Sequence, residues 1–126
     1  MKIIPPSAPI PLIDAEAYTQ NWRNFNNANM VNGNPLSGYL ANAFTFDLQD
    51  INDLMNEPGV AHVRIYFGYD NASPSPSVPP PMKVMLVGVD SEGNDIIYSS
   101  EAQANSGIYD FAIPCPPTCD SNSPLS

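Results

Sequence analysis

The cysteines are the residues whose type and spacing come nearest to a chemical motif. Cys115 and Cys119 flank Pro–Pro–Thr, which gives a C-x3-C spacing. The redox C-x2-C motif is one residue shorter, and a zinc site normally needs four ligands. A tight turn stiffened by prolines can bring the two Cα atoms within the roughly 7 Å that a disulfide requires. The pattern therefore favours a small-loop disulfide or two unreactive thiols, with a metal or redox role as the alternative.

His62 is the only histidine in the sequence, so it is the natural candidate for acid–base chemistry. Alternation within its expected strand places it on one face with Arg64 and Tyr66. A general base needs an orienting partner, and the nearest acids along the chain, Glu57 and Asp70, lie beyond the strand ends. No serine stands in G-x-S-x-G, and no G-x-G phosphate loop occurs. We predict no catalytic residue, and an enzyme of unrecognised type is the third of three functional hypotheses.

The segment DSEGND, residues 90–95, alternates oxygen ligands at Asp90, Glu92 and Asn94. Calcium loops use this kind of spacing, but the EF-hand has its glycine at position six of the loop. Here Gly93 stands at position four, and a hairpin turn explains it. We predict a turn and no metal or cofactor, and leave calcium binding by residues 90–95 as an open alternative.

The charge of the chain argues against several classes of partner. Thirteen acidic residues face four basic ones among 126 residues, which gives a formal net charge of −9. Such a surface repels phosphate backbones and anionic membranes. The basic residues form no patch, because they are scattered along the chain: Lys2, Arg23, Arg64 and Lys83. We therefore expect no nucleic-acid partner, and the excess of acids favours solubility.

The first thirteen residues are apolar but are interrupted by prolines. A secretory signal needs an uninterrupted apolar stretch of about 7–15 residues, and a membrane-spanning helix needs about 20. No segment meets either requirement. The sequence thus predicts no Sec signal peptide and no membrane span. A cytoplasmic location follows by default, with extracellular assembly by a non-classical route left open.

Periodicity predicts the elements that position these residues. One helix is expected to begin at Asp14 as its N-cap, with a buried face formed by Tyr18, Trp22 and Phe25. A second helix is expected to follow Asp47 as its cap. The buried stripe of this second helix is expected to be Leu48, Ile51, Leu54 and Met55. Strands are expected over residues 40–46, 60–69, 83–89, 95–99 and 108–113.

The order of these elements places most strands next to one another in the second half of the chain, which favours antiparallel pairing. The predicted fold is α+β, a mostly antiparallel sheet of about four to five strands with two helices on one face and proline-rich extended N- and C-terminal arms. Three parts are expected: a proline-rich arm over 1–13, a single α+β domain over 14–113 with a proline-rich loop over 71–81, and a CPPTC tail over 114–126.

Apolar residues on the two arms indicate interaction surfaces. Free disordered ends are usually polar, whereas apolar extended ends prefer a groove or a sheet edge, their own or a neighbour's. We predict a non-enzymatic structural or interaction protein that self-assembles, as a homo-oligomer or filament, by docking these arms. Its partner is a copy of itself or another protein. The expected anchors are Ile3, Ile4, Ile10, Leu12 and Leu125.

A small binding module for a ligand or glycan is the alternative hypothesis. Its expected contacts are the aromatic side chains Trp22, Tyr66 and Tyr69. Trp22 has a competing assignment, because helical spacing places it in the core with Tyr18 and Phe25. A deep pocket lined by aromatic side chains would favour this alternative.

Three segments together resemble part of a bacterial protein group. They are VRIYFG at 63–68, VMLVGVDSEGNDII at 84–97 and IYDFAIPCPPTCDSNSPL at 108–125. They resemble small Bacteroidota-type proteins whose function is not known, over about the C-terminal half of the chain, and the CPPxC…SPL ending is the most specific part. The long proline loop at 71–81 departs from that pattern. The resemblance implies a bacterial source and carries over no catalytic residue.

Overall fold

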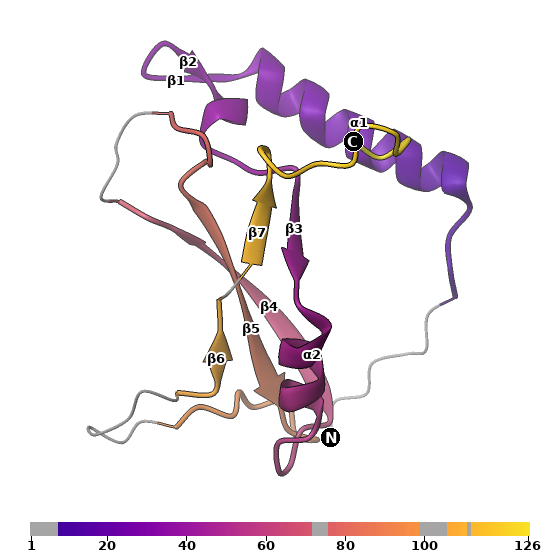
Figure 1. Cartoon of the computed structure of the whole chain (residues 1–126), viewed down its shortest axis with the longest axis vertical. Coiled ribbons are helices and arrows are strands. Elements are labelled where there is room, and N and C mark those ends of the chain that lie inside the picture. The colour runs from indigo at the N-terminus through magenta and orange to yellow at the C-terminus, as the bar shows by residue number, and fades with distance from the viewer. Residues whose placement is uncertain (1–7, 72–75, 99–105, 111) are drawn as a thin grey trace. The chain divides into compact units, whose positions relative to one another are not determined.

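The computed structural model describes residues 8–71, 76–98, 106–110 and 112–126. Its helices are α1 (Leu12–Ala28), α2 (Leu48–Met55) and the short 3-10 helix η1 (Leu36–Gly38). Its strands are β1 (Met30–Val31), β2 (Asn34–Pro35), β3 (Ala43–Phe46), β4 (His62–Tyr69), β5 (Met82–Val89), β6 (Ile108–Tyr109) and β7 (Ala112–Cys115). The α+β class with mostly antiparallel strands is confirmed (Figure 1).

The strands form three small sheets in place of one sheet of four to five strands. Their orders are β1–β2, β3–β7 and β4–β5–β6. The described chain divides into two compact units, each with one α-helix. The first unit comprises Phe46–Gly68 and Lys83–Ala112, and the second comprises residues 8–45, Tyr69–Met82 and Ile113–Ser126. The predicted boundaries of arm, domain and tail stay a prediction.

The first unit is built around β5, the central strand of its sheet. Val84, Leu86, Val87 and Val89 are all buried, so both faces of the strand are covered, as its continuous apolar run predicts. Helix α2 covers one face at Gly88, where a Cβ atom would lie 2.7 Å from Val60 Cγ2 and 3.4 Å from Leu54 Cδ1. The close approach of these side chains requires a glycine at this position.

Helix α2 begins as predicted, because the Asp47 carboxylate accepts a hydrogen bond of 3.3 Å from the Gln49 N–H. Its expected buried stripe is only partly correct. Leu54 is fully buried and Ile51 is half-buried, whereas Leu48 and Met55 are exposed. An eight-residue helix has about two turns, so few of its side chains can face the sheet.

Helix α1 in the second unit begins at Leu12, so the prediction of Asp14 as its N-cap is wrong. Pro11 takes the cap position with φ −58° and ψ 144°, and Asp14 lies in the first turn. Proline suits the start of a helix because it needs no N–H partner there. The carboxylate of Asp14 still lies close to the positive end of the helix dipole.

The predicted buried face of α1 is also wrong. Tyr18, Trp22 and Phe25 are all exposed, and Asn26 is the buried residue of this helix. The spacing of the aromatic residues is helical, as expected, but periodicity alone does not show what the face meets. The cause of the error is tertiary: α1 is covered around Asn26, and the Trp22 indole donates to the Ala41 carbonyl at 3.0 Å while its ring stays partly exposed.

The hairpin of β1 and β2 lies outside all the strand ranges that the sequence predicts. The strands pair Met30 with Pro35 and Val31 with Asn34. Asn32 and Gly33 form the tip, with φ values of 51° and 79°. Both residues tolerate this left-handed geometry, and Asn-Gly is the preferred sequence of a two-residue hairpin turn.

The last predicted strand, residues 108–113, is two strands in two different sheets. β6 pairs with β5, with Leu86 opposite Tyr109, and β7 pairs with β3. The predicted strand over 95–99 is reduced to one bridge between Val89 and Asp95, and residue 99 lies outside the described residues. Among the helices of the described ranges, none has the length and apolar character needed to cross a membrane.

Candidate functional site

Arg64 and Tyr66, on the polar face of β4, bond to the turn that follows β5. Arg64 Nη1 lies 2.5 Å from Asp95 Oδ1, Arg64 Nη2 donates to the Gly93 carbonyl at 3.2 Å, and the Tyr66 hydroxyl donates to Asp95 Oδ2. Tyr66 and Asp95 raise the pKa of the Arg64 guanidinium. These bonds attach β4 to the turn that follows β5. The half-buried side chain of His62 makes no hydrogen bond or ion pair within the described chain, so it has no orienting partner there.

The segment 90–95 forms the predicted turn. Asp90 Oδ1 accepts hydrogen bonds of 2.9 Å from the N–H groups of Glu92 and Asn94. The backbone hydrogen bond from Asn94 lowers the pKa of the Asp90 carboxyl. Asp95 is held by Arg64, and no three His, Cys, Asp or Glu side chains within the described ranges converge to hold a metal ion. Asp90 therefore serves the turn, and Asp95 attaches the turn to β4.

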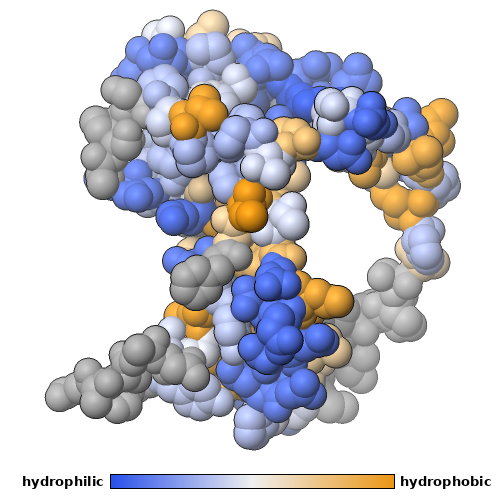
Figure 2. Space-filling view, viewed as in Figure 1, coloured by the Kyte–Doolittle hydropathy of each residue, from blue (hydrophilic) through white to orange (hydrophobic). Residues whose placement is uncertain are grey.

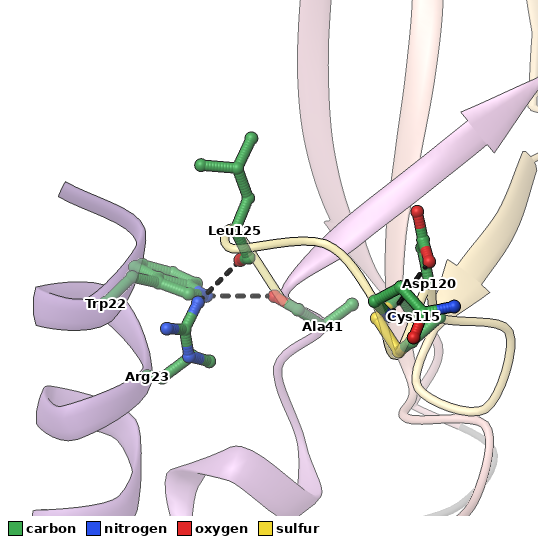
Figure 3. The surroundings of a disulfide bond; sticks show 8 residues. Trp22, Arg23, Ala41, Cys115, Asp120 and Leu125 are labelled. Atoms are coloured by element: carbon green, nitrogen blue, oxygen red, sulfur yellow. Dashed lines mark hydrogen bonds between the residues drawn. A yellow bond between two sulfur atoms is a disulfide. The ribbon is translucent and has the colours of Figure 1, made fainter. Parts of the chain in front are cut away.

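The two cysteines form a disulfide between Cys115 and Cys119, with their Cα atoms 4.9 Å apart. Cys115 is buried at the end of β7, and its carbonyl accepts a hydrogen bond of 2.7 Å from the Asn42 N–H. Figure 3 shows the tail that follows the disulfide loop reaching helix α1. There Arg23 Nη1 donates to the Leu125 carbonyl at 2.5 Å. The disulfide and this bond fix the direction of the tail.

The predicted anchors that the structure describes are exposed on their own chain. Ile10 is 56% exposed, Leu12 is 57% exposed, and Leu125 is also exposed. Ile3 and Ile4 lie outside the described residues. Leu12 is the first residue of α1, so the extended part of the described arm is limited to residues 8–11. These apolar side chains remain available for an intermolecular contact.

The apolar face of β4 is a second uncovered surface. Val63, Ile65 and Phe67 are 44%, 55% and 74% exposed, although alternation predicts one apolar strand face for them. They share the face that carries α2, because a Cβ atom at Gly68, on the opposite face, would lie 2.9 Å from Met85 Cε and 3.5 Å from Lys83 Cβ. Helix α2 reaches Gly88 of β5 but leaves these three side chains open. β4 is also the edge strand of its sheet.

A third apolar surface follows one side of α1, where the exposed Tyr18, Trp22 and Phe25 lie at helical spacing. The Trp22 indole donates a hydrogen bond of 3.0 Å from Nε1 to the Ala41 carbonyl, while the ring remains partly exposed (Figure 3). Figure 2 shows hydrophobic side chains among the hydrophilic ones on the visible surface. Exposed apolar side chains that share one side of a helix are typical of interaction sites, and these three do so by their spacing.

Two cavities each include one of the predicted aromatic contacts. A cavity of about 190 Å³ in the first unit is lined by Tyr66, Phe67, Met85, Val87, Ile97 and Ile108. A larger cavity of about 360 Å³ in the second unit is lined by Val31, Asn32, Leu36, Tyr39, Leu40, Tyr69 and Asn71. Trp22 lines neither of them. The assignment of Tyr66 and Tyr69 as ligand contacts stays a prediction; their neighbours in the two cavities were not predicted, and the Asn-Gly turn beside Val31 was the one local signal at the larger cavity.

Comparison of the chain with protein-family models, with curated proteins and with solved structures found no match in any of the three.

Proposed function

We propose that the chain is a non-enzymatic structural protein that self-assembles by docking its proline-rich segment and its apolar surfaces on neighbouring copies. The observation that carries the proposal is the exposure of β4, where Val63, Ile65 and Phe67 stand open on an edge strand. An exposed apolar edge strand is a template for pairing with another chain. Nothing else in the described residues gives this strand a second hydrogen-bonded neighbour.

The same chain carries matching apolar segments that its own fold leaves uncovered. Ile10 lies between Pro9 and Pro11, and Leu12 follows them, with both side chains more than half exposed. Proline biases the residue before it towards extended backbone, which is the conformation that docks on an edge or in a groove. Because one chain carries both the segment that docks and the exposed strand β4 that can receive it, a second copy of the chain is the favoured partner.

Molar mass in solution tests this proposal directly. We expect the full chain to show a mass of at least twice 13.6 kDa by light scattering, with a shift towards 13.6 kDa on dilution. Ile10→Asp should lower the oligomeric fraction, because it places a charge on a segment that docks through apolar contacts. A full chain of 13.6 kDa at every concentration would rule the proposal out.

Ala8→Asp is the matched control for this experiment. Ala8 is exposed in the same segment, and the substitution adds the same charge without removing a large apolar side chain. The oligomeric fraction should fall clearly more with Ile10→Asp than with Ala8→Asp. Equal effects would show that charge alone governs the association and would contradict apolar docking.

A ligand- or glycan-binding module is the second candidate, and one observation favours it. Tyr66 and Tyr69 line cavities, and the cavity at Tyr69 has about 360 Å³, within the roughly 300–1,000 Å³ of ligand pockets. Titration of the isotope-labelled full chain with neutral mono- and disaccharides tests it. Saturable shifts confined to residues around Tyr69 would support this candidate, and the absence of shifts at any sugar concentration would remove it.

A further inference from the structure

The larger cavity is formed by three segments of the second unit that meet from distant parts of the sequence. The β1–β2 hairpin supplies Val31 and Asn32, the chain around η1 supplies Leu36, Tyr39 and Leu40, and the end of β4 supplies Tyr69 and Asn71. All seven lining residues belong to this one unit. No residue of the proline-rich segment 8–11 lines the cavity.

Backbone hydrogen bonds hold the walls of this cavity in place. The Leu36 N–H donates to the Asn29 carbonyl at 2.8 Å, and the Tyr39 N–H donates to the Leu36 carbonyl at 2.8 Å. The Asp70 N–H donates to the Pro81 carbonyl at 2.8 Å, between two of the lining residues. The site therefore needs little rearrangement to receive a ligand, which lowers the entropic cost of binding.

The side chains that line the cavity are aromatic, aliphatic or amide groups, and none is charged. Two tyrosines and three aliphatic side chains supply apolar surface, and Asn32 and Asn71 supply the amides. No lining residue carries a charge, so an ion pair cannot select the ligand. The amide groups of both asparagines make no hydrogen bond within the described chain, so their donors are available. A fitting ligand has flat apolar rings and uncharged hydrogen-bond acceptors.

We propose that this cavity binds the proline-rich segment 5–11, PPSAPIP, of a second copy of the chain. The proposal rests on the proposed self-association and names its acceptor site. Aromatic-lined grooves recognise proline-rich segments because the polyproline II helix is preformed and offers proline rings beside free carbonyl oxygens. Pro11 has this geometry, with φ −58° and ψ 144°, and Ile10 beside it is exposed. Pro6 and Pro9 add a P-x-x-P spacing.

The reach of the segment favours a second copy over the chain's own cavity. Residues 8–11 precede α1, whereas the hairpin that supplies Val31 and Asn32 follows its C-terminal end (Figure 1). A helix of 17 residues is about 25 Å long, whereas the seven residues 5–11 span about 22 Å as polyproline II. The segment would also have to reverse its direction at Pro11. The segment 5–11 is therefore too short to reach the cavity of its own chain.

Charge also favours this pairing. Residues 1–13 contain Lys2 and no acid, so all thirteen acids lie in residues 14–126. With a formal net charge of −9 for the whole chain and +1 for this segment, the remainder carries −9 − 1 = −10. A weakly basic segment approaching an acidic body is attracted, and salt screens that attraction.

A peptide of residues 1–13, acetylated, amidated and labelled with a fluorophore, tests the proposal against the dilute full chain. We expect saturable binding by fluorescence anisotropy, and about tenfold weaker binding to the full-chain variant Tyr69→Ala because an aromatic anchor is lost. Ile113→Ala is the matched control, since Ile113 is an exposed apolar residue of the same unit outside the cavity. Equal affinity for the two variants would overturn the proposal.

A second peptide with Pro6, Pro9 and Pro11 replaced by alanine tests the conformation of the ligand. It keeps Lys2 and the isoleucines but loses the polyproline II bias, so its binding should be at least about tenfold weaker. Equal binding of both peptides would overturn the proposal. Added salt should weaken binding of the original peptide, because Lys2 then contributes less attraction.

The two proposals fail in distinguishable ways. An oligomeric full chain whose mass does not change with Tyr69→Ala, and which does not bind the peptide, would overturn the cavity assignment and leave self-association standing. A full chain that stays at 13.6 kDa would overturn self-association. Peptide binding by that chain would still assign the cavity to a proline-rich ligand, supplied then by another protein.

Discussion

At the scale of single residues, Asn26 is the least expected side chain of the fold. It is completely buried in α1, and both its Nδ2 and its Oδ1 lack a hydrogen-bond partner within the described chain. A buried polar group without a partner costs free energy, whereas an apolar group of similar shape does not. The position therefore weakens a helix that has little else buried.

Asn26→Leu should raise the free energy of unfolding by about 1–2 kcal/mol, because it removes the unpaired amide and adds apolar burial. Urea unfolding measures the change. Asn24→Leu is the control, since Asn24 is exposed on the same helix and the substitution has the same effect on helix propensity. A loss of stability with Asn26→Leu beyond that of the control would contradict the prediction and would indicate an ordered water bound to the amide.

Tyr109 should make the stability of the first unit depend on pH in the alkaline range. Burial, followed by the hydrogen bond of 2.8 Å to Glu57 Oε1, raises the pKa of the Tyr109 hydroxyl to about 12. An unfolded tyrosine titrates near pH 10, so the folded chain binds the proton more tightly between about pH 10 and 12. This contribution to stability is complete below pH 10 and is lost as the pH rises towards 12.

Tyr109→Phe should remove that part of the pH dependence. We expect the free energy of unfolding of the original chain to fall more steeply between about pH 10 and 12 than that of the variant. Chemical unfolding at a series of pH values measures both slopes. Parallel curves in this range would show that the Tyr109 hydroxyl does not contribute.

At the scale of elements, neighbouring strands of one sheet differ in how well they are covered. Val84 of β5 is buried, whereas Val63 of β4 is exposed on the same face of the sheet. Val84→Thr should lower the free energy of unfolding by about 1–3 kcal/mol, because it buries a hydroxyl group. Val63→Thr should change it by less than about 0.5 kcal/mol. Urea unfolding of dilute protein compares them, and equal losses would show that β4 is covered in the monomer.

Some elements are predictable from the sequence and others are not. β5 was predictable because a continuous apolar run has one main explanation, and α2 was predictable because Asp47 caps it locally. The exposure of Trp22 was not predictable, since it depends on which element packs against α1. The larger cavity was not predictable either, because it joins residues 31–40 with residues 69–71 and no local pattern connects them.

At the scale of the whole molecule, net charge and apolar surface oppose each other in self-association. Two copies with a formal charge of −9 repel, while their exposed apolar side chains attract. Raising the salt concentration from about 20 mM to about 500 mM screens this repulsion, which involves more charges than the attraction of the single Lys2, and should increase the oligomeric fraction. Sedimentation at both concentrations measures this. A decrease with salt would show that ion pairs hold the oligomer together.

Gly38 adjoins the wall of the larger cavity, the site that we propose receives the proline-rich segment of a second copy. A Cβ atom at Gly38 would lie 2.6 Å from the Cβ of Pro76, and the Ser77 N–H donates to the Gly38 carbonyl at 3.4 Å. Gly38 stands between Leu36 and Tyr39, two residues that line the cavity. A single added methyl group would therefore push Pro76 away from η1 without changing any lining side chain. A substitution at Gly38 would thus change the affinity of the cavity by moving its backbone, while the side chains that contact the ligand stay the same.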